Sequence, residues 1–152
     1  MEVILYQPEI PQNTGNIVRT CSVTGASLTL VRPLGFSISD KTLKRAGLDY
    51  WNEVSIKYID DLEDYLLSTS HNFYFFSSKA TKNHFEIQYD SDDLLIFGSE
   101  TQGLNPKFFQ KWPERFVKIP MISKARCLNL SNSVAIALYE ALRQNPRLLN
   151  KL

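Results

Sequence analysis

Short apolar runs alternate along the chain with stretches in which apolar residues recur at helical spacing. The runs that predict strands are residues 2–7, 27–33, 53–59, 72–77, 94–99 and 116–121. The stretches that predict helices are residues 13–24, 39–47, 61–68, 105–112 and 130–145, and residues 79–93 read as a polar loop. Strands that alternate with helices predict a single α/β domain over residues 1–152, with a mostly parallel sheet and helices on both faces.

The carboxyl ends of these strands are the expected ligand-binding positions, because ligands of open α/β sheets bind beyond those ends. The segments that this rule selects follow Gln7, Ser77, Gly98 and Pro120.

The last predicted helix is apolar on more than one side. Leu130, Val134, Leu138 and Leu142 follow i, i+4 spacing, and residues 134–138 include no polar residue. A helix that is apolar all round is buried on several sides. Two interpretations follow: a central core helix, or a helix with one side against a second subunit.

Composition excludes some classes of protein. The chain carries 22% charged residues and a formal net charge of +1, which argues against broad coating of nucleic acid but not against a local basic site on a dimer. Cys21 and Cys127 lack metal-type spacing and are expected as free thiols, and no metal centre is expected. The N-terminal residues do not resemble a signal peptide, and no apolar run approaches the roughly 20 residues that span a bilayer. We therefore expect the protein in the cytoplasm.

The first candidate motif is N-T-G-N-I-V-R, at the entrance of the first predicted helix. Free N–H groups at a helix N-terminus favour anions, Gly15 permits close approach, and Arg19 can grip a phosphate with two N–H groups. Asn13 and Asn16 add donors and acceptors, so the set suits a phosphodiester or a ribose. The alternative is that Asn13 is an N-cap and Arg19 a solvated surface residue.

The second candidate motif, residues 94–104, ends a strand in Gly98-Ser99-Glu100, and Gly103 follows. Two glycines around an acid are typical of a loop that avoids side-chain bulk near a ligand. The motif is neither a Walker sequence nor G-x-G-x-x-G. The alternative is a tight turn in which Glu100 holds loop N–H groups.

The third candidate motif, residues 118–133, leads from a strand through Lys124 and Arg126 to the last helix. Small polar residues crowd that helix entrance: Asn129, Ser131, Asn132 and Ser133. Such a loop could hold an adenine by backbone hydrogen bonds. Plain helix capping is the alternative.

A basic face is a further candidate, for RNA. It would comprise Arg32, Lys41, Lys44 and Arg45. Tyr50 and Trp51 could stack on bases. Otherwise these residues are ordinary surface and core.

The three motifs in this order resemble the SpoU-type branch of the SPOUT methyltransferases, and within it the small tRNA (cytidine/uridine-34) 2′-O-methyltransferases. The resemblance extends from Val3 to about Arg143, and includes Y-Q-P-E-I-P-Q-N-T-G-N before the first helix and R-A-G-L-D-Y-W at residues 45–51. It implies a C-terminal deep trefoil knot, S-adenosylmethionine as cofactor, tRNA as substrate and a homodimer with sites near the interface. The cofactor residues that it implies are Phe76, Ser77, Gly98, Ser99, Glu100, Ile119, Pro120, Met121, Cys127, Leu128 and Asn129. Cys127 departs from the serine that relatives often carry.

The resemblance further implies methyl transfer to the ribose 2′-hydroxyl of the wobble nucleotide, cytidine or modified uridine. Arg19 is the implied catalytic residue, with Asn13 and Asn16 beside it. The expected RNA contacts are Arg19, Lys41, Lys44, Arg45, Ser131 and Asn132. Two other functions stay open at this point: methylation of another tRNA or rRNA ribose, and a non-catalytic RNA-binding α/β dimer.

Overall fold

A seven-stranded parallel sheet forms the centre of the protein in the computed structural model, which describes residues 1–37, 50–122 and 127–151. The strands are β1 (Glu2–Tyr6), β2 (Ser27–Val31), β3 (Ile56–Ile59), β4 (Phe73–Phe76), β5 (Lys82–Asn83), β6 (Leu94–Phe97) and β7 (Phe116–Lys118). Their order across the sheet is β3-β2-β1-β6-β4-β7-β5, and every pair is parallel. The predicted α/β class and parallel sheet are confirmed.

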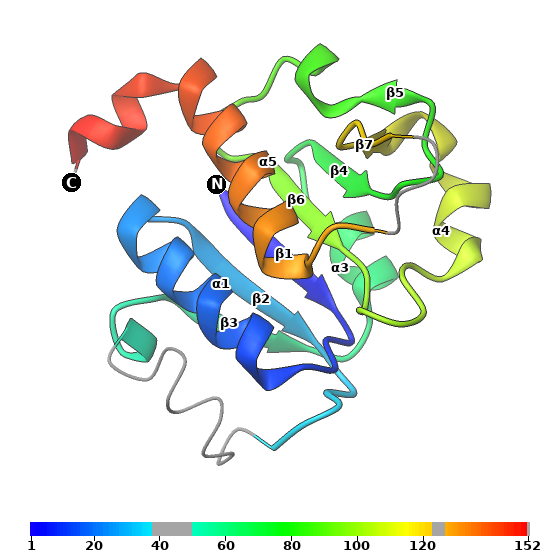
Figure 1. The fold of residues 1–152 in the computed structure, drawn as a ribbon, viewed down its shortest axis with the longest axis horizontal. Coiled ribbons are helices and arrows are strands. Elements are labelled where there is room, and N and C mark those ends of the chain that lie inside the picture. The colour runs from blue at the N-terminus through cyan, green and yellow to red at the C-terminus, as the bar shows by residue number, and fades with distance from the viewer. Residues whose placement is uncertain (38–49, 123–126, 152) are drawn as a thin grey trace.

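Helices cover both faces of this sheet (Figure 1). The helices are α1 (Pro11–Thr24), α3 (Leu62–Ser68), α4 (Pro106–Lys111) and α5 (Leu130–Gln144), with short 3-10 turns η1 (His84–Glu86), η2 (Pro113–Arg115) and η3 (Pro146–Lys151). Helices α1 and α5 share one apolar cluster with the sheet, and α3 and α4 share the other. Within the described residues, no helix has the length and apolar character needed to cross a membrane.

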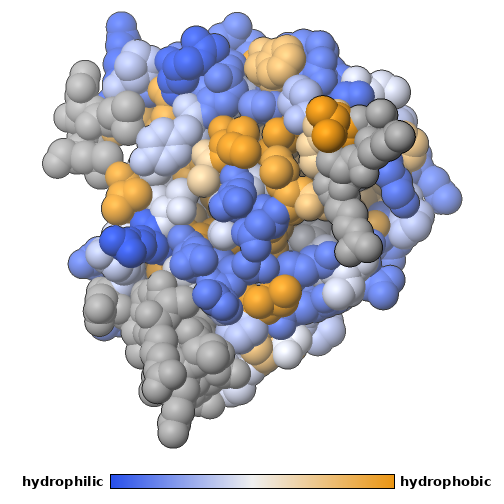
Figure 2. Space-filling model, viewed as in Figure 1, coloured by the Kyte–Doolittle hydropathy of each residue, from blue (hydrophilic) through white to orange (hydrophobic). Residues whose placement is uncertain are grey.

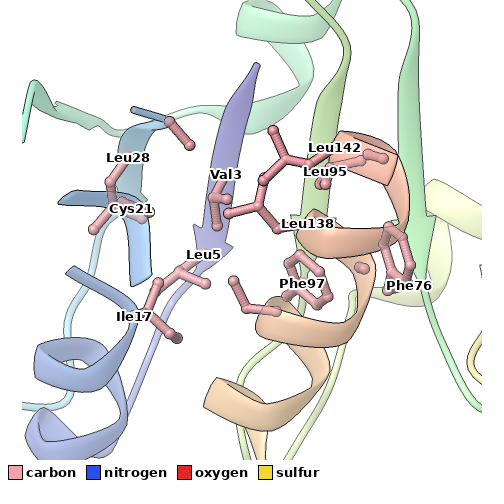
Figure 3. Close-up of a cluster of buried hydrophobic side chains, with 14 of the residues drawn as sticks. Val3, Leu5, Ile17, Cys21, Leu28, Phe76, Leu95, Phe97, Leu138 and Leu142 are labelled. Atoms are coloured by element: carbon pink, nitrogen blue, oxygen red, sulfur yellow. The ribbon is translucent and has the colours of Figure 1, made fainter. Parts of the chain in front are cut away.

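Alternation along the strands builds the two clusters. In β1, Val3 and Leu5 join the α1–α5 cluster, whereas Ile4 joins the α3–α4 cluster. Successive side chains of a strand point to opposite faces, so a short apolar run contributes to both. Figure 3 shows Val3 and Leu5 beside Ile17 of α1 and Leu138 of α5.

Three predicted elements need comment. Helix α1 begins at Pro11 rather than Asn13, and Ile10 is the residue before it, so the prediction of Asn13 as N-cap is wrong. Gly25 ends α1 at φ 68°, a left-handed conformation that is common at helix C-termini, and the predicted end at residue 24 is confirmed. The predicted loop 79–93 contains β5 and η1, and the predicted helix 39–47 lies outside the described residues.

Helix α5 packs one side onto the core and leaves the other uncovered in the single chain. Val134, Leu138 and Leu142 are buried, whereas Ile136 is 40% and Tyr139 is 52% exposed. The core interpretation therefore holds for one side of α5. The second-subunit interpretation of the other side stays a prediction, and so does the trefoil knot.

Candidate functional site

A cavity of about 840 Å³ opens at the carboxyl ends of β4, β6 and β7. Its walls are the loops after β4 and β6, the segment after β7 and the residues before α5. The predicted cofactor residues that line it are Phe76, Ser77, Gly98, Ser99, Glu100, Ile119, Met121, Cys127, Leu128 and Asn129. Pro120 is not part of the lining. The strand-end rule therefore selected the edge of the sheet at which this cavity lies.

Several lining residues were not among the predicted cofactor residues. Lys79, Gln102 and Phe109 are examples. Lys79 lies two residues after Ser77, within the segment that the strand-end rule selects. Phe109 lies on α4 next to the buried Phe108, and such an apolar pair gives no functional signal in the sequence. Among the described residues, no group of three His, Cys, Asp or Glu side chains is placed to hold a metal ion.

The loop after β6 folds back on itself, and Gly98 is required for that reason. Ser99 and Gly103 exchange two backbone hydrogen bonds, of 3.1 and 3.0 Å. A Cβ on Gly98 would lie 2.2 Å from the carbonyl carbon of Gly103, a backbone atom that cannot move alone. Gly103 itself has φ 69°, which glycine adopts without strain. The structure therefore shows the tight turn, and because Gly98 and Gly103 also line the cavity, the role of both glycines in leaving room for a ligand stays a prediction.

Glu100 holds the entrance of α1. Its carboxylate accepts hydrogen bonds from the backbone nitrogens of Glu9 (2.8 Å) and Ile10 (3.2 Å) and from the side-chain nitrogen of Asn13 (3.0 Å). A negative charge at a helix N-terminus is favourable. Two of these N–H groups belong to residues just before the first motif and the third belongs to Asn13 within it, whereas the alternative had placed them in the loop of Glu100 itself.

Asn13 and Asn129 continue this contact to the third motif. Asn129 donates its side-chain N–H to Oδ1 of Asn13 at 2.9 Å. The Oδ1 of Asn129 caps α5 by accepting from the backbone nitrogens of Ser131 (2.9 Å) and Asn132 (3.3 Å). We call the chain of contacts through Glu100, Asn13 and Asn129 the motif bridge, because it joins all three sequence motifs.

Arg19 and Asn16 are exposed on α1 and do not line the cavity. Arg19 follows Asn13 by six residues, which is about 9 Å along a helix. Its guanidinium carbon lies 5.3 Å from the centre of the Tyr50 ring. Gly15 is buried within α1 and does not line the cavity either. The structure thus brings Asn13 to the cavity, but within one chain it does not bring Arg19 and Asn16 there.

The remaining predicted RNA contacts divide into two groups. Ser131 and Asn132 lie in the first turn of α5, next to the motif bridge. The predicted contacts Lys41, Lys44 and Arg45 lie outside the described residues.

The two cysteines are free thiols, as predicted, and differ in environment. Cys127 is exposed and lines the cavity, with its sulfur 3.5 Å from the hydroxyl oxygen of Ser78. Cys21 is buried in α1, and burial raises the pKa of its thiol to about 12. Cys127 is therefore the thiol that solvent and a ligand in the cavity would meet.

Comparison with known proteins assigns the family. The SpoU rRNA methylase family model matches residues 1–139. A Bacillus subtilis (strain 168) protein, provisionally named a tRNA (cytidine(34)-2′-O)-methyltransferase, is 49% identical over 148 residues, which cover 95% of this chain and 92% of that protein. A structure solved in work on 2-OH methylation of C/U34 on tRNA is 40% identical, with a TM-score of 0.88 over 95% of this chain and 90% of its own. An AdoMet-bound rRNA methyltransferase of Sinorhizobium meliloti is 26% identical, with a TM-score of 0.82 over 93% of this chain and 55% of its own. By this match over nearly its whole length, the chain belongs to the SpoU rRNA methylase family.

Proposed function

We propose that this protein transfers a methyl group from S-adenosylmethionine to the ribose 2′-hydroxyl of the wobble nucleotide of tRNA, cytidine or modified uridine 34. The observation that carries the proposal is the motif bridge, which gathers the three family motifs at one cavity. The choice of nucleotide rests on the name of the Bacillus subtilis relative and on the solved C/U34 structure.

The cavity suits the cofactor in size and chemistry. Ligand pockets for molecules of this size measure about 300–1,000 Å³ and combine apolar walls with a few polar groups. Here Phe76, stacked on Phe97 with ring centres 4.6 Å apart, supplies apolar wall, and the loops at Ser77 and Leu128 supply backbone polar groups. When bound, S-adenosylmethionine supplies a methyl group that is already activated on a sulfonium. The protein's own task is therefore mainly to align the ribose with it.

Arg19 is assigned to RNA. A guanidinium has five N–H donors and no acceptor, so Arg19 would hold a phosphate and stabilise negative charge that develops on the ribose oxygen. It is a poor choice as the proton acceptor. Glu100 already accepts three hydrogen bonds, so we assign it to positioning. The proton of the ribose 2′-hydroxyl is then transferred to a phosphate or to water.

We propose a homodimer through the face that α1 and α5 cover. Figure 2 shows apolar side chains gathered at the centre of this face and hydrophilic ones around them. Val23, Ile136 and Tyr139 are 51%, 40% and 52% exposed there. A second subunit on this face would cover them, and Arg19 would then serve a site shared between the two chains. A tRNA substrate also fits our expectation of a cytoplasmic protein.

Mass spectrometry of tRNA nucleosides, from cells with and without the gene, tests the proposal. We expect one 2′-O-methylated pyrimidine at position 34 to disappear. Loss of a methylated ribose elsewhere in tRNA or in rRNA would name a different target. A purified protein that binds RNA but shows no calorimetric binding of S-adenosylmethionine would favour the non-catalytic alternative.

A variant separates the roles of Arg19 and the cavity. Arg19→Ala should abolish methyl transfer and leave S-adenosylmethionine affinity within about twofold, because Arg19 lies outside the cavity lining. The matched control is Arg143→Ala on α5, whose guanidinium is already paired with Glu140. If Arg19→Ala loses cofactor affinity instead, the assignment of Arg19 to RNA is wrong.

A further inference from the structure

A short turn before β3, residues 50–54, packs alongside α1 and brings the Tyr50 ring next to the Arg19 side chain. Tyr50 and Trp51 are partly buried against the α1–α5 cluster, and Val54 is buried in it. The guanidinium carbon of Arg19 lies 5.3 Å from the Tyr50 ring centre, within the roughly 6 Å at which a cation and a ring attract one another.

A second contact fixes the same turn in place. The hydroxyl of Ser22 donates to Oε2 of Glu53 at 2.7 Å. Ser22 follows Arg19 by three residues on α1, and Glu53 follows Tyr50 by three residues, with its backbone nitrogen bonded to the Tyr50 carbonyl at 3.1 Å. Residues three apart on a helix share a face. The turn therefore lies along α1 with two contacts, and Tyr50 is held independently of Arg19.

Stacking on a ring restricts an arginine without occupying its donors. A carboxylate partner would fix the side chain too, but it would take up the N–H groups and neutralise the charge. An aromatic face contacts the plane of the guanidinium and leaves the N–H groups at its edge free. Among the described residues, Arg19 forms no salt bridge.

We propose that Tyr50 is a positioning residue for the methyl-transfer reaction: its ring holds the Arg19 guanidinium on the surface of α1 with its donors free to bind an RNA phosphate. This inference rests on the proposed role of Arg19. It is an alternative to the expectation that Tyr50 stacks on a base, and it makes the Arg19 side chain pre-organised for binding.

The test compares Tyr50→Leu with Tyr50→Phe, which keeps the ring. We expect Tyr50→Leu to lower kcat/KM for tRNA about 3- to 30-fold, the factor that a cation–ring contact is worth. Tyr50→Phe should stay within about twofold of the wild type, and neither variant should change S-adenosylmethionine affinity. The matched control is Tyr58→Leu, because Tyr58 packs on the same cluster. If Tyr50→Leu has the same kcat/KM for tRNA as the wild type, the proposal is wrong.

The double variant distinguishes positioning from base stacking. If Tyr50 acts through Arg19, Tyr50→Leu has no further effect on tRNA affinity or on its salt dependence once Arg19→Ala is present. If Tyr50 stacks on a base, the two losses multiply, and the proposal is wrong.

An NMR measurement tests the contact independently of the reaction. The side-chain Nε–H signal of Arg19, identified by its absence in Arg19→Lys, should carry a ring-current shift that Tyr50→Leu removes and Tyr50→Phe retains. If that shift behaves as expected while Arg19→Ala remains fully active, the proposed function of Arg19 has failed and the contact has not. If the shift is absent in the wild type, the proposed contact itself is wrong.

Discussion

Replacing Asn13 with aspartate would place a second carboxylate against Glu100. The Asn13 side-chain nitrogen lies 3.0 Å from Oε1 of Glu100, and Asn13 is only 6% exposed. Two negative charges at that separation repel by about 5.5 kcal/mol at an effective dielectric constant of about 20. The bond from Asn129 to Oδ1 of Asn13 still finds an oxygen in the variant, so the substitution mainly changes the Glu100 contact.

The variant can avoid this repulsion by holding one proton between the two carboxyls. Protonating a carboxyl group with an ordinary pKa of about 4 costs about 4 kcal/mol at pH 7. This is less than the repulsion, so we expect the folded pair to carry a proton at neutral pH. Because the folded pair binds that proton more tightly than the unfolded chain, stability is lost as pH rises. The loss should reach about 4 kcal/mol at pH 7 and shrink by about 1.4 kcal/mol per pH unit toward pH 4.

Urea denaturation of wild type and Asn13→Asp, at several values between about pH 5 and pH 8, measures this difference. Asn16→Asp is the matched control, because it adds the same charge to the same helix at an exposed position. Its difference from wild type should be small and nearly constant with pH. A loss for Asn13→Asp that does not grow with pH, or that Asn16→Asp reproduces, refutes the assigned geometry.

Three further predictions follow from the site and the core. Gly98→Ala should abolish calorimetric binding of S-adenosylmethionine and lower the unfolding free energy by about 3 kcal/mol or more, because its Cβ would overlap the Gly103 backbone. Gly103→Ala has open space for the Cβ but a positive φ, so its unfolding free energy should fall by only about 1–2 kcal/mol. A maleimide should label Cys127 in the folded protein and Cys21 only after unfolding. S-adenosylmethionine should slow the labelling of Cys127, because Cys127 lines the cavity. Equal labelling rates with and without the cofactor would place the ligand elsewhere. Burial lowers the pKa of His84, although the nearby Glu140 carboxylate acts to raise it. The unfolded chain therefore binds the proton more tightly, and the unfolding free energy should fall as pH drops below about 6.5. His84→Gln should lack that part of the decline.

Most of the fold follows from local sequence patterns. The strands β1, β2, β4 and β6 are apolar runs with buried side chains, and such runs are visible without a structure. Strand β5 was missed because its residues, Lys82 and Asn83, are polar, and only pairing with β7 makes them a strand. The N-cap of α1 was misassigned because the helix begins two residues earlier than predicted, at Pro11. The N–H groups of the two residues just before it bond to Glu100, which is distant in sequence.

The candidate site could be predicted in part. The strand-end rule and the three motifs located the cavity, whereas the partner of each polar group could not be read from the motifs. Asn13 is not the N-cap of α1, and its amide joins Glu100 to Asn129, which its sequence position did not reveal. Tyr50 was a candidate for base stacking, and no sequence pattern indicated that its ring lies beside Arg19.

The sequence by itself determined most of the elements, the buried faces and the edge of the sheet at which the cavity lies, because hydrophobic periodicity and strand ends are properties of neighbouring residues. Only the tertiary structure decided which polar groups meet. The bonds of Asn13 reach Glu100 and Asn129 across 87 and 116 residues of chain. Contacts of that range depend on the path of the whole backbone, which no local pattern encodes.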